Sequence, residues 1–269
     1  SGDTGKAALE GFCDVPDTEI IVFYPSDGVS PMQKLQMDSQ KGGNVHVVAI
    51  RGNFDDAQSG VKKIFTDNAV KQRLAENGMQ FSSANSINWG RLAPQIVYYV
   101  SAYCDMLNRG EDIKNGFNVV VPTGNFGNIL AAYYAKKMGV PISKLICASN
   151  SNNVLTDFIR TGVYDRNRKF YTTVSPSMDI LISSNLERML FELSGEDDKA
   201  VAKMQAELSK SGVFKVSNEI KNKMEELKES NYKKVVGGKF NSINDIEKAL
   251  NRLNSWDKDR FSSSLYLTP

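Results

Sequence analysis

The stretch Val119-Val120-Val121-Pro122-Thr123-Gly124-Asn125-Phe126-Gly127-Asn128-Ile129-Leu130 decides the fold. Its valines form an apolar run typical of a buried parallel strand, and a helical pattern begins after the second glycine. A strand, a glycine-containing loop and a helix in this order predict one βα unit of a parallel sheet.

Similar units lie on both sides of this stretch. Apolar runs at residues 19–24, 45–50, 117–121 and 144–148 predict strands. Helical patterns occupy residues 6–12, 30–39, 55–65, 87–108, 128–138 and 152–161. The alternation predicts an α/β fold with a doubly wound, mostly parallel sheet flanked by helices.

Beyond residue 185 the pattern changes to charged helical segments without strong strands between them. These segments are residues 186–193, 197–209, 217–230 and 243–253. We therefore expect an α/β region over residues 1–185 and a mainly helical C-terminal region over residues 186–269.

Composition and charge exclude several classes of protein. Lys plus Arg number 33 against 31 Asp plus Glu, so no excess of basic residues supports a nucleic-acid or membrane-surface partner. No apolar run approaches the roughly 20 residues of a spanning helix. The cysteines Cys13, Cys104 and Cys147 are far apart and resemble reduced core thiols, which favours a cytoplasmic protein. A single histidine, His46, on a predicted strand leaves too few parts for a zinc site or a Ser-His-Asp triad, so we expect no metal.

The loop between Val121 and Ile129 is a candidate phosphate site. Ligands of open α/β sheets bind beyond the carboxyl ends of the strands, and a helix start presents unpaired N–H groups. Gly124 and Gly127 let the backbone curl so that these groups converge, and nearby Thr and Asn side chains add donors. A plain βα turn with Asn128 as the N-cap fits the same residues, so spacing alone leaves both interpretations open.

Two further polar segments are less specific. Residues 1–6, Ser-Gly-Asp-Thr-Gly-Lys, resemble the end of a P-loop, but Ala7 stands where a hydroxyl is needed, and a polar helix-capping turn remains. Residues 82–91 hold more polar side chains than one N-cap requires. They fit the wall of a site or a surface loop, with Arg91 as an anion ligand or a surface ion-pair partner.

Taken in chain order, five segments resemble the threonine synthase family. They are Ser-Gly-Asp-Thr-Gly-Lys at 1–6; Tyr-Pro at 24–25 with Ser-Pro-Met-Gln at 30–33; Asn-Ser-Ile-Asn at 85–88 with Arg-Leu at 91–92 and Gln-Ile-Val-Tyr-Tyr at 95–99; Pro-Thr-Gly-Asn-Phe-Gly-Asn at 122–128; and Ser-Pro-Ser-Met-Asp-Ile at 175–180. The resemblance covers roughly residues 1 to 230 and is far more specific than any single segment.

The resemblance implies a pyridoxal-phosphate (PLP) enzyme of fold type II, like the tryptophan synthase β subunit. Such a lyase of threonine biosynthesis converts O-phosphohomoserine and water to threonine and phosphate by γ-elimination and β-addition of water. By the same resemblance, the PLP phosphate would be held by Gly124, Asn125, Phe126, Gly127 and Asn128. The substrate would be bound by Ser1, Asp3 and Thr4, and by Asn85, Ser86, Asn88 and Arg91.

The chain also departs from the family pattern. The family's Phe-Lys-Asp segment, which carries the PLP lysine, lies before the Ser-Gly-Asp-Thr-Gly loop and is absent from this chain. The later Asp-Pro-His-Thr-Ala segment is missing too, and nothing matches from Gly237 onward. We therefore expect a fragment that is inactive alone, has no catalytic residue of its own, and has the N-terminal part of the same enzyme as its partner.

Two alternatives remain open at this point. One is a serine/threonine dehydratase, which shares the fold and the cofactor, although the Asn-Phe-Gly-Asn loop and the Ser-Ile-Asn segment favour threonine synthase. The other is a catalytically inert domain that keeps only the phosphate or PLP site.

Overall fold

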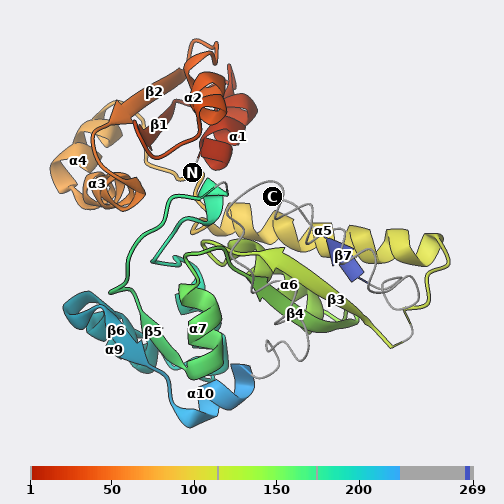
Figure 1. Cartoon of the computed structure of the whole chain (residues 1–269). Helices are drawn as coiled ribbons and strands as arrows, with labels where there is room; N and C mark the ends of the chain where they lie inside the picture. Colours follow the sequence, from red (N-terminus) through yellow and green to blue (C-terminus); the bar gives the residue numbers. More distant parts are fainter. Residues whose placement is uncertain (1, 114, 174, 225–263, 267–269) are drawn as a thin grey trace. The chain divides into compact units, whose positions relative to one another are not determined.

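A computed structural model of the chain describes residues 2–113, 115–173, 175–224 and 264–266. The chain forms two units, Ser1–Asn85 and Ser86–Pro269, drawn in Figure 1. This division differs from the boundary expected at residue 185, because the helices after that residue share the core of the second unit.

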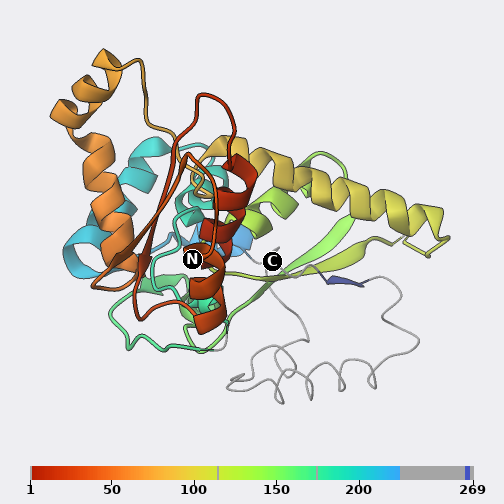
Figure 2. The same ribbon diagram turned by 90° about the horizontal axis from the view of Figure 1, so that it is seen from above.

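The first unit is built on a two-stranded parallel sheet. Its elements are α1 (Gly2–Phe12), β1 (Ile20–Pro25), α2 (Pro31–Asp38), β2 (Val45–Ile50), α3 (Phe54–Thr66) and α4 (Asn68–Glu76). The strands pair in register from Ile20 opposite Val45 to Pro25 opposite Ile50. Helices α1 and α2 lie on one side of this sheet and α3 on the other (Figures 1 and 2). Its small core contains Leu9, Tyr24 and Met37.

The second unit carries a parallel sheet with the strand order β4-β3-β7 and a separate antiparallel pair, β5 and β6. Its elements are α5 (Trp89–Asn108), β3 (Phe117–Pro122), α6 (Gly127–Lys137), β4 (Ile142–Ala148), α7 (Val154–Thr161), β5 (Val163–Asp165), η1 (Pro176–Met178), α8 (Leu186–Leu193), α9 (Asp198–Ser211), β6 (Val213–Lys215), α10 (Asn218–Lys223) and β7 (Ser264–Tyr266). The parallel pairings confirm the α/β class.

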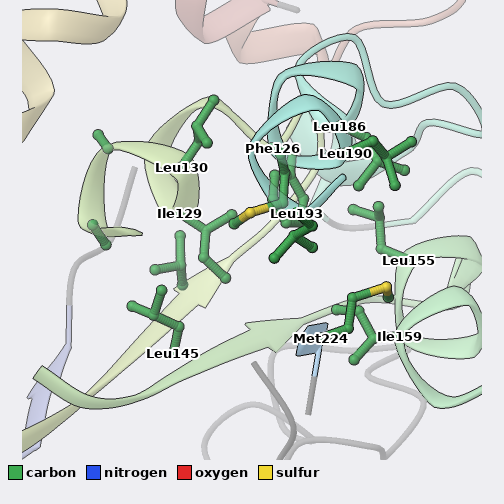
Figure 3. Packing of buried hydrophobic residues seen from close by; sticks show 14 of the residues in the cluster. Phe126, Ile129, Leu130, Leu145, Leu155, Ile159, Leu186, Leu190, Leu193 and Met224 are labelled. Carbon is green, nitrogen blue, oxygen red and sulfur yellow. The ribbon is translucent and has the colours of Figure 1, made fainter. Parts of the chain in front are cut away.

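One apolar cluster joins the sheet of the second unit to its later helices. Along β3, Phe117, Val119 and Val121 are buried while the residues between them are half-buried, as the alternation of a strand requires. Figure 3 shows side chains of α6, β4, α7 and α8 in the same cluster. The apolar face of α8 is therefore part of the core of the second unit.

Several expected features differ from the structure or fall outside the described residues. Helix α4 and the short strands β5 and β6 had no counterpart in the predicted elements. The predicted helix 243–253 and residues 225–230 of the preceding one lie outside the described part. Cys104 is exposed on α5 and is not a core thiol. Within the described residues, no helix has the length and apolar character needed to cross a bilayer.

Candidate phosphate site at the start of α6

The candidate site begins where β3 ends beside β4. The N–H of Thr123 donates to the carbonyl oxygen of Ala148 at 2.8 Å, and the Thr123 hydroxyl donates to the oxygen of Val121 at 2.7 Å. Thr123 is buried, so its hydroxyl holds the strand end and is committed to the fold. The loop thus starts at the carboxyl ends of two parallel strands, where open α/β sheets bind their ligands.

Phe126 gives this loop its shape. Its backbone is left-handed, with φ 64° and ψ 5°, a conformation that costs a non-glycine residue about 1–2 kcal/mol. The side chain is 1% exposed and lies in the core with Ile129, Leu190 and Leu193 (Figure 3). Burial of the ring stabilises the strained turn, and a left-handed residue next to right-handed ones turns successive N–H groups to one side.

The glycines of the loop are required by space. A Cβ on Gly127 would lie 3.0 Å from the Ser86 Cβ and 3.4 Å from the Asn185 Nδ2, and one on Gly124 would lie 2.7 Å from the Ser177 oxygen. The positive φ of this loop is found at Phe126 and at neither glycine.

We call the run of backbone N–H groups from Gly124 to Ile129 the phosphate cup. The first backbone hydrogen bond of α6 runs from the Leu130 N–H to the Phe126 oxygen at 3.2 Å. Within the described residues, no group accepts a hydrogen bond from the backbone N–H of residues 124–129. The positive end of the helix macrodipole lies at the same place, so the phosphate cup suits an anion.

Asn128 is not the N-cap of α6. The N-cap is Phe126, whose side chain makes no capping hydrogen bond, and Asn128 lies inside the first turn. Its side-chain oxygen accepts a hydrogen bond from the Tyr99 hydroxyl, which also donates to the Asn128 carbonyl oxygen at 3.2 Å. Burial raises the pKa of Tyr99, so this hydroxyl keeps its proton and acts as a donor. The structure therefore ties Asn128 to α5.

Three further predicted residues lie at the start of α5. The Ser86 hydroxyl accepts from Asn185 Nδ2 at 2.9 Å, beside Gly127, and Asn88 caps α5 by accepting from the Gly90 N–H at 2.9 Å. Arg91 lies in the first turn of α5, where burial lowers its pKa. Of the three, the contacts place Ser86 directly against the cup.

The remaining predicted residues belong to the first unit. Asp3 and Thr4 lie in α1, which begins at Gly2, so this segment is helical where we expected a loop. Asn85 is the last residue of the same unit. Ser1 lies outside the described residues.

Sequence reasoning missed the residues that support the phosphate cup from behind. Ser183, Ser184 and Asn185, the turn before α8, donate hydrogen bonds to Gly124 and Asn125. The available signal in the sequence was weak: three polar residues precede a strongly amphipathic helix. The structure shows that the side chains of Ser183 and Asn185 are buried.

A second supporting cluster was also missed. The buried Asp179 carboxylate accepts from Asn150 Nδ2 at 2.6 Å, Asn152 Nδ2 at 3.0 Å and the Thr173 hydroxyl at 2.7 Å. These bonds hold the segment that carries Ser177 against Gly124. Here a signal existed, because the polar run 149–153 directly follows β4 at its carboxyl end.

Comparisons with known proteins show which family the chain belongs to. No family model matches the chain. Human threonine synthase-like 1 is 46% identical over 234 residues, which are 84% of this chain and 32% of that protein. The chain belongs to the threonine synthase family. It spans about a third of the length of this curated relative.

Two solved threonine synthase structures resemble the chain as well. A structure described as PLP-bound threonine synthase from Brucella melitensis has a TM-score of 0.72 and 44% identity, covering 84% of this chain and 46% of that one. The structure of threonine synthase from yeast has a TM-score of 0.76 and 34% identity, and the match covers 98% of this chain and 55% of the yeast chain. The similarity to the threonine synthase family therefore holds in sequence and in fold.

Proposed function

We propose that this chain is part of a PLP-dependent threonine synthase and that its phosphate cup holds the cofactor's phosphate. The observation that carries the proposal is the run of backbone N–H groups from Gly124 to Ile129, which have no acceptor among the described residues. Buried or enclosed N–H groups are normally paired, so such a run suits a phosphate with several acceptor oxygens.

The residues present fit a phosphate group rather than a neutral ligand. Gly124 and Gly127 have no Cβ, and a Cβ at either position would meet neighbouring atoms at 3.0 Å or less. Backbone donors supplemented by a helix N-terminus hold a phosphate without a charged side chain. The Brucella melitensis relative, described as PLP-bound, makes PLP the phosphate compound of first choice.

When bound, PLP would supply an electron sink for breaking and forming bonds at the substrate's carbon atoms. The contribution of this chain is to bind and orient. The phosphate cup would fix the phosphate end of the cofactor, and buried Phe126 would hold the backbone of the cup rigid.

The substrate would be O-phosphohomoserine, which reacts with water to give threonine and phosphate. Such a substrate brings a second phosphate and a carboxylate, and both need donors. Ser86, Asn88 and Arg91 at the start of α5 are proposed as substrate groups, together with Ser1, Asp3, Thr4 and Asn85 of the first unit. Arg91 carries the positive charge of this set and supports anion recognition.

Binding measurements test the phosphate cup. We expect the chain to bind PLP more tightly than pyridoxal, which lacks the phosphate, by at least about tenfold, since one charge-assisted hydrogen bond contributes about 1.5–3 kcal/mol. Inorganic phosphate should compete. Gly127→Val places a branched side chain against Ser86 and Asn185 and should abolish the preference. Gly60→Val in α3, where nothing lies within 4 Å of a Cβ, is the matched control. Equal affinity for PLP and pyridoxal would contradict the assignment.

A chimera tests the reaction. The chain would replace the aligned segment of yeast threonine synthase. The structural match between the two covers 98% of this chain. The chimera should convert O-phosphohomoserine to threonine and restore growth of a threonine auxotroph, and Gly127→Val within it should not. A folded chimera that binds PLP but releases no phosphate from O-phosphohomoserine would favour an inert binding domain.

A further inference from the structure

The turn before α8, residues 183–185, donates hydrogen bonds to acceptor atoms in the loop of the phosphate cup. The Ser183 hydroxyl donates to the Gly124 carbonyl oxygen at 2.9 Å. The Asn125 carbonyl oxygen accepts from both the N–H and the Nδ2 of Asn185, at 3.0 and 3.1 Å. The Ser184 hydroxyl donates to Asn125 Oδ1 at 3.3 Å. Both carbonyl oxygens at the start of the cup are thus paired from behind.

Pairing a carbonyl oxygen also directs an N–H group. The peptide unit is planar and trans, so the oxygen of one residue and the N–H of the next point in opposite directions. Holding the Gly124 oxygen therefore fixes the N–H of Asn125, and holding the Asn125 oxygen fixes the N–H of Phe126. The same bonds keep the negative ends of these peptides away from a bound anion.

Arg188 sets the orientation of the Asn185 amide. Its guanidinium donates to Asn185 Oδ1 at 2.7 Å, and because a guanidinium has no acceptor, that atom must be the oxygen. The nitrogen is left to donate to the Asn125 carbonyl and to the Ser86 hydroxyl. Arg188 also donates to the carbonyl oxygens of Ser86, at 3.4 Å, and of Ile87.

Asn185 is completely buried, with 0% of its surface exposed. A buried amide is tolerated only when its donors and acceptor are satisfied, and among the described residues the Asn185 amide has its partners in the loop of the cup, in Ser86 and in Arg188. An apolar side chain could fill the same volume for packing alone. The specific bonds therefore point to a role in shaping the loop.

We propose that Asn185, oriented by Arg188 and assisted by Ser183, is a positioning residue that gives the phosphate cup its selectivity for phosphate-bearing ligands. This inference rests on the proposed function, since it explains how the cup aims its N–H groups. None of the three would touch the ligand. Ser183 acts through the backbone of Gly124, and Asn185, oriented by Arg188, acts through the backbone of Asn125.

The test compares PLP, pyridoxal and inorganic phosphate on the wild-type chain and three variants. Ser183→Ala removes one donor to the Gly124 oxygen and should weaken PLP and phosphate binding several-fold, while pyridoxal binding changes by less than about twofold. Asn185→Ala should weaken both phosphate-bearing ligands by about tenfold or more. Ser194→Ala is the matched control, because its hydroxyl donates to the Phe191 oxygen at the same 2.9 Å, but at the other end of α8.

The outcomes separate this inference from the proposed function. A wild-type chain that does not prefer PLP to pyridoxal overturns both. If the wild type shows the preference and Ser183→Ala and Asn185→Ala retain it in full, the positioning role alone is overturned. A parallel loss of PLP and pyridoxal binding in folded Ser183→Ala also overturns it, since a purely structural defect has that signature. Should Asn185→Ala fail to fold, Ser183→Ala, which deletes a single oxygen, decides the question.

Discussion

At the scale of single residues, Cys147 shows how little access solvent has to the strand ends next to the phosphate cup. Part of the residue's surface is exposed, but its thiol is enclosed, and burial raises the pKa of the thiol from 9.0 to about 12. Hydrogen bonds with Thr123 and Ser149 oppose this increase without cancelling it. Since only the thiolate attacks a disulfide or alkylating reagent, this thiol should be inert.

We expect thiol labelling to distinguish the cysteines. At pH 8, a disulfide reagent should modify exposed Cys104 quickly and Cys147 at least about a hundredfold more slowly, because burial removes both access and thiolate. Mass spectrometry of labelled peptides measures the two rates, with the chain unfolded in guanidinium as the reference in which they converge. Rapid labelling of Cys147 in the folded chain would show that the strand end is open.

At this scale, sequence reasoning named part of the candidate site. Gly124, Gly127 and Ser86 do lie together, because a loop after a buried strand and a helix start are local patterns. The sequence did not predict the role of Asn185. Its contacts with Asn125 and Ser86 span 60 and 99 positions, and no local pattern states that a turn before a late helix folds onto an earlier loop.

At the scale of elements, the helices α8 and α9 are both followed by a glycine with a left-handed backbone, and the two positions can be compared directly. Gly195 follows α8 and Gly212 follows α9, and both have φ of 78°. A Cβ on Gly195 meets nothing within 4 Å, whereas one on Gly212 would lie 2.2 Å from the Asn167 Oδ1. Asn167 itself donates to the Ser211 carbonyl oxygen at 2.7 Å, which secures the end of α9.

Replacing each glycine by alanine separates backbone strain from crowding. Gly195→Ala should lower the free energy of unfolding by about 1 kcal/mol, the cost of a left-handed alanine. Gly212→Ala should lower it by about 1–3 kcal/mol more, because Asn167 must move and the Ser211 carbonyl loses its donor. Urea unfolding monitored by circular dichroism gives both values. Equal losses would mean that the Asn167 side chain relocates freely.

The elements that sequence patterns predicted and those that they missed differ in burial. Strand β3 and helices α5 and α8 match their predicted ranges closely, because each carries a strong apolar face. Helix α4 was missed, and it has no buried residue and hence no apolar stripe to detect. Strands β5 and β6 are three residues each, too short for a period-two pattern.

At the scale of the whole molecule, the two units have cores of different size. The first unit's cluster consists of Leu9, Tyr24 and Met37 with partly buried neighbours, and β2 has no fully buried residue. The second unit's cluster extends over β3, β4 and the helices from α5 to α10. Apolar burial stabilises by about 25 cal/mol per Å², so the first unit has much less of this stabilisation of its own.

We therefore expect the first unit to open at lower free energy than the second. Amide hydrogen exchange followed by mass spectrometry should show β1 and β2 exchanging at least about a hundredfold faster than β3 and β4, which corresponds to about 2.7 kcal/mol in opening free energy. If the phosphate cup binds PLP without the first unit, PLP should slow amide exchange at residues 124–129 and leave the exchange rate of β2 unchanged. Leu9→Ala is the matched variant, because deleting this fully buried side chain should accelerate exchange throughout β1 and β2 and leave β3 unaffected. Equal protection of all four strands, lost together at one denaturant concentration, would instead mean that the chain unfolds as a single cooperative body.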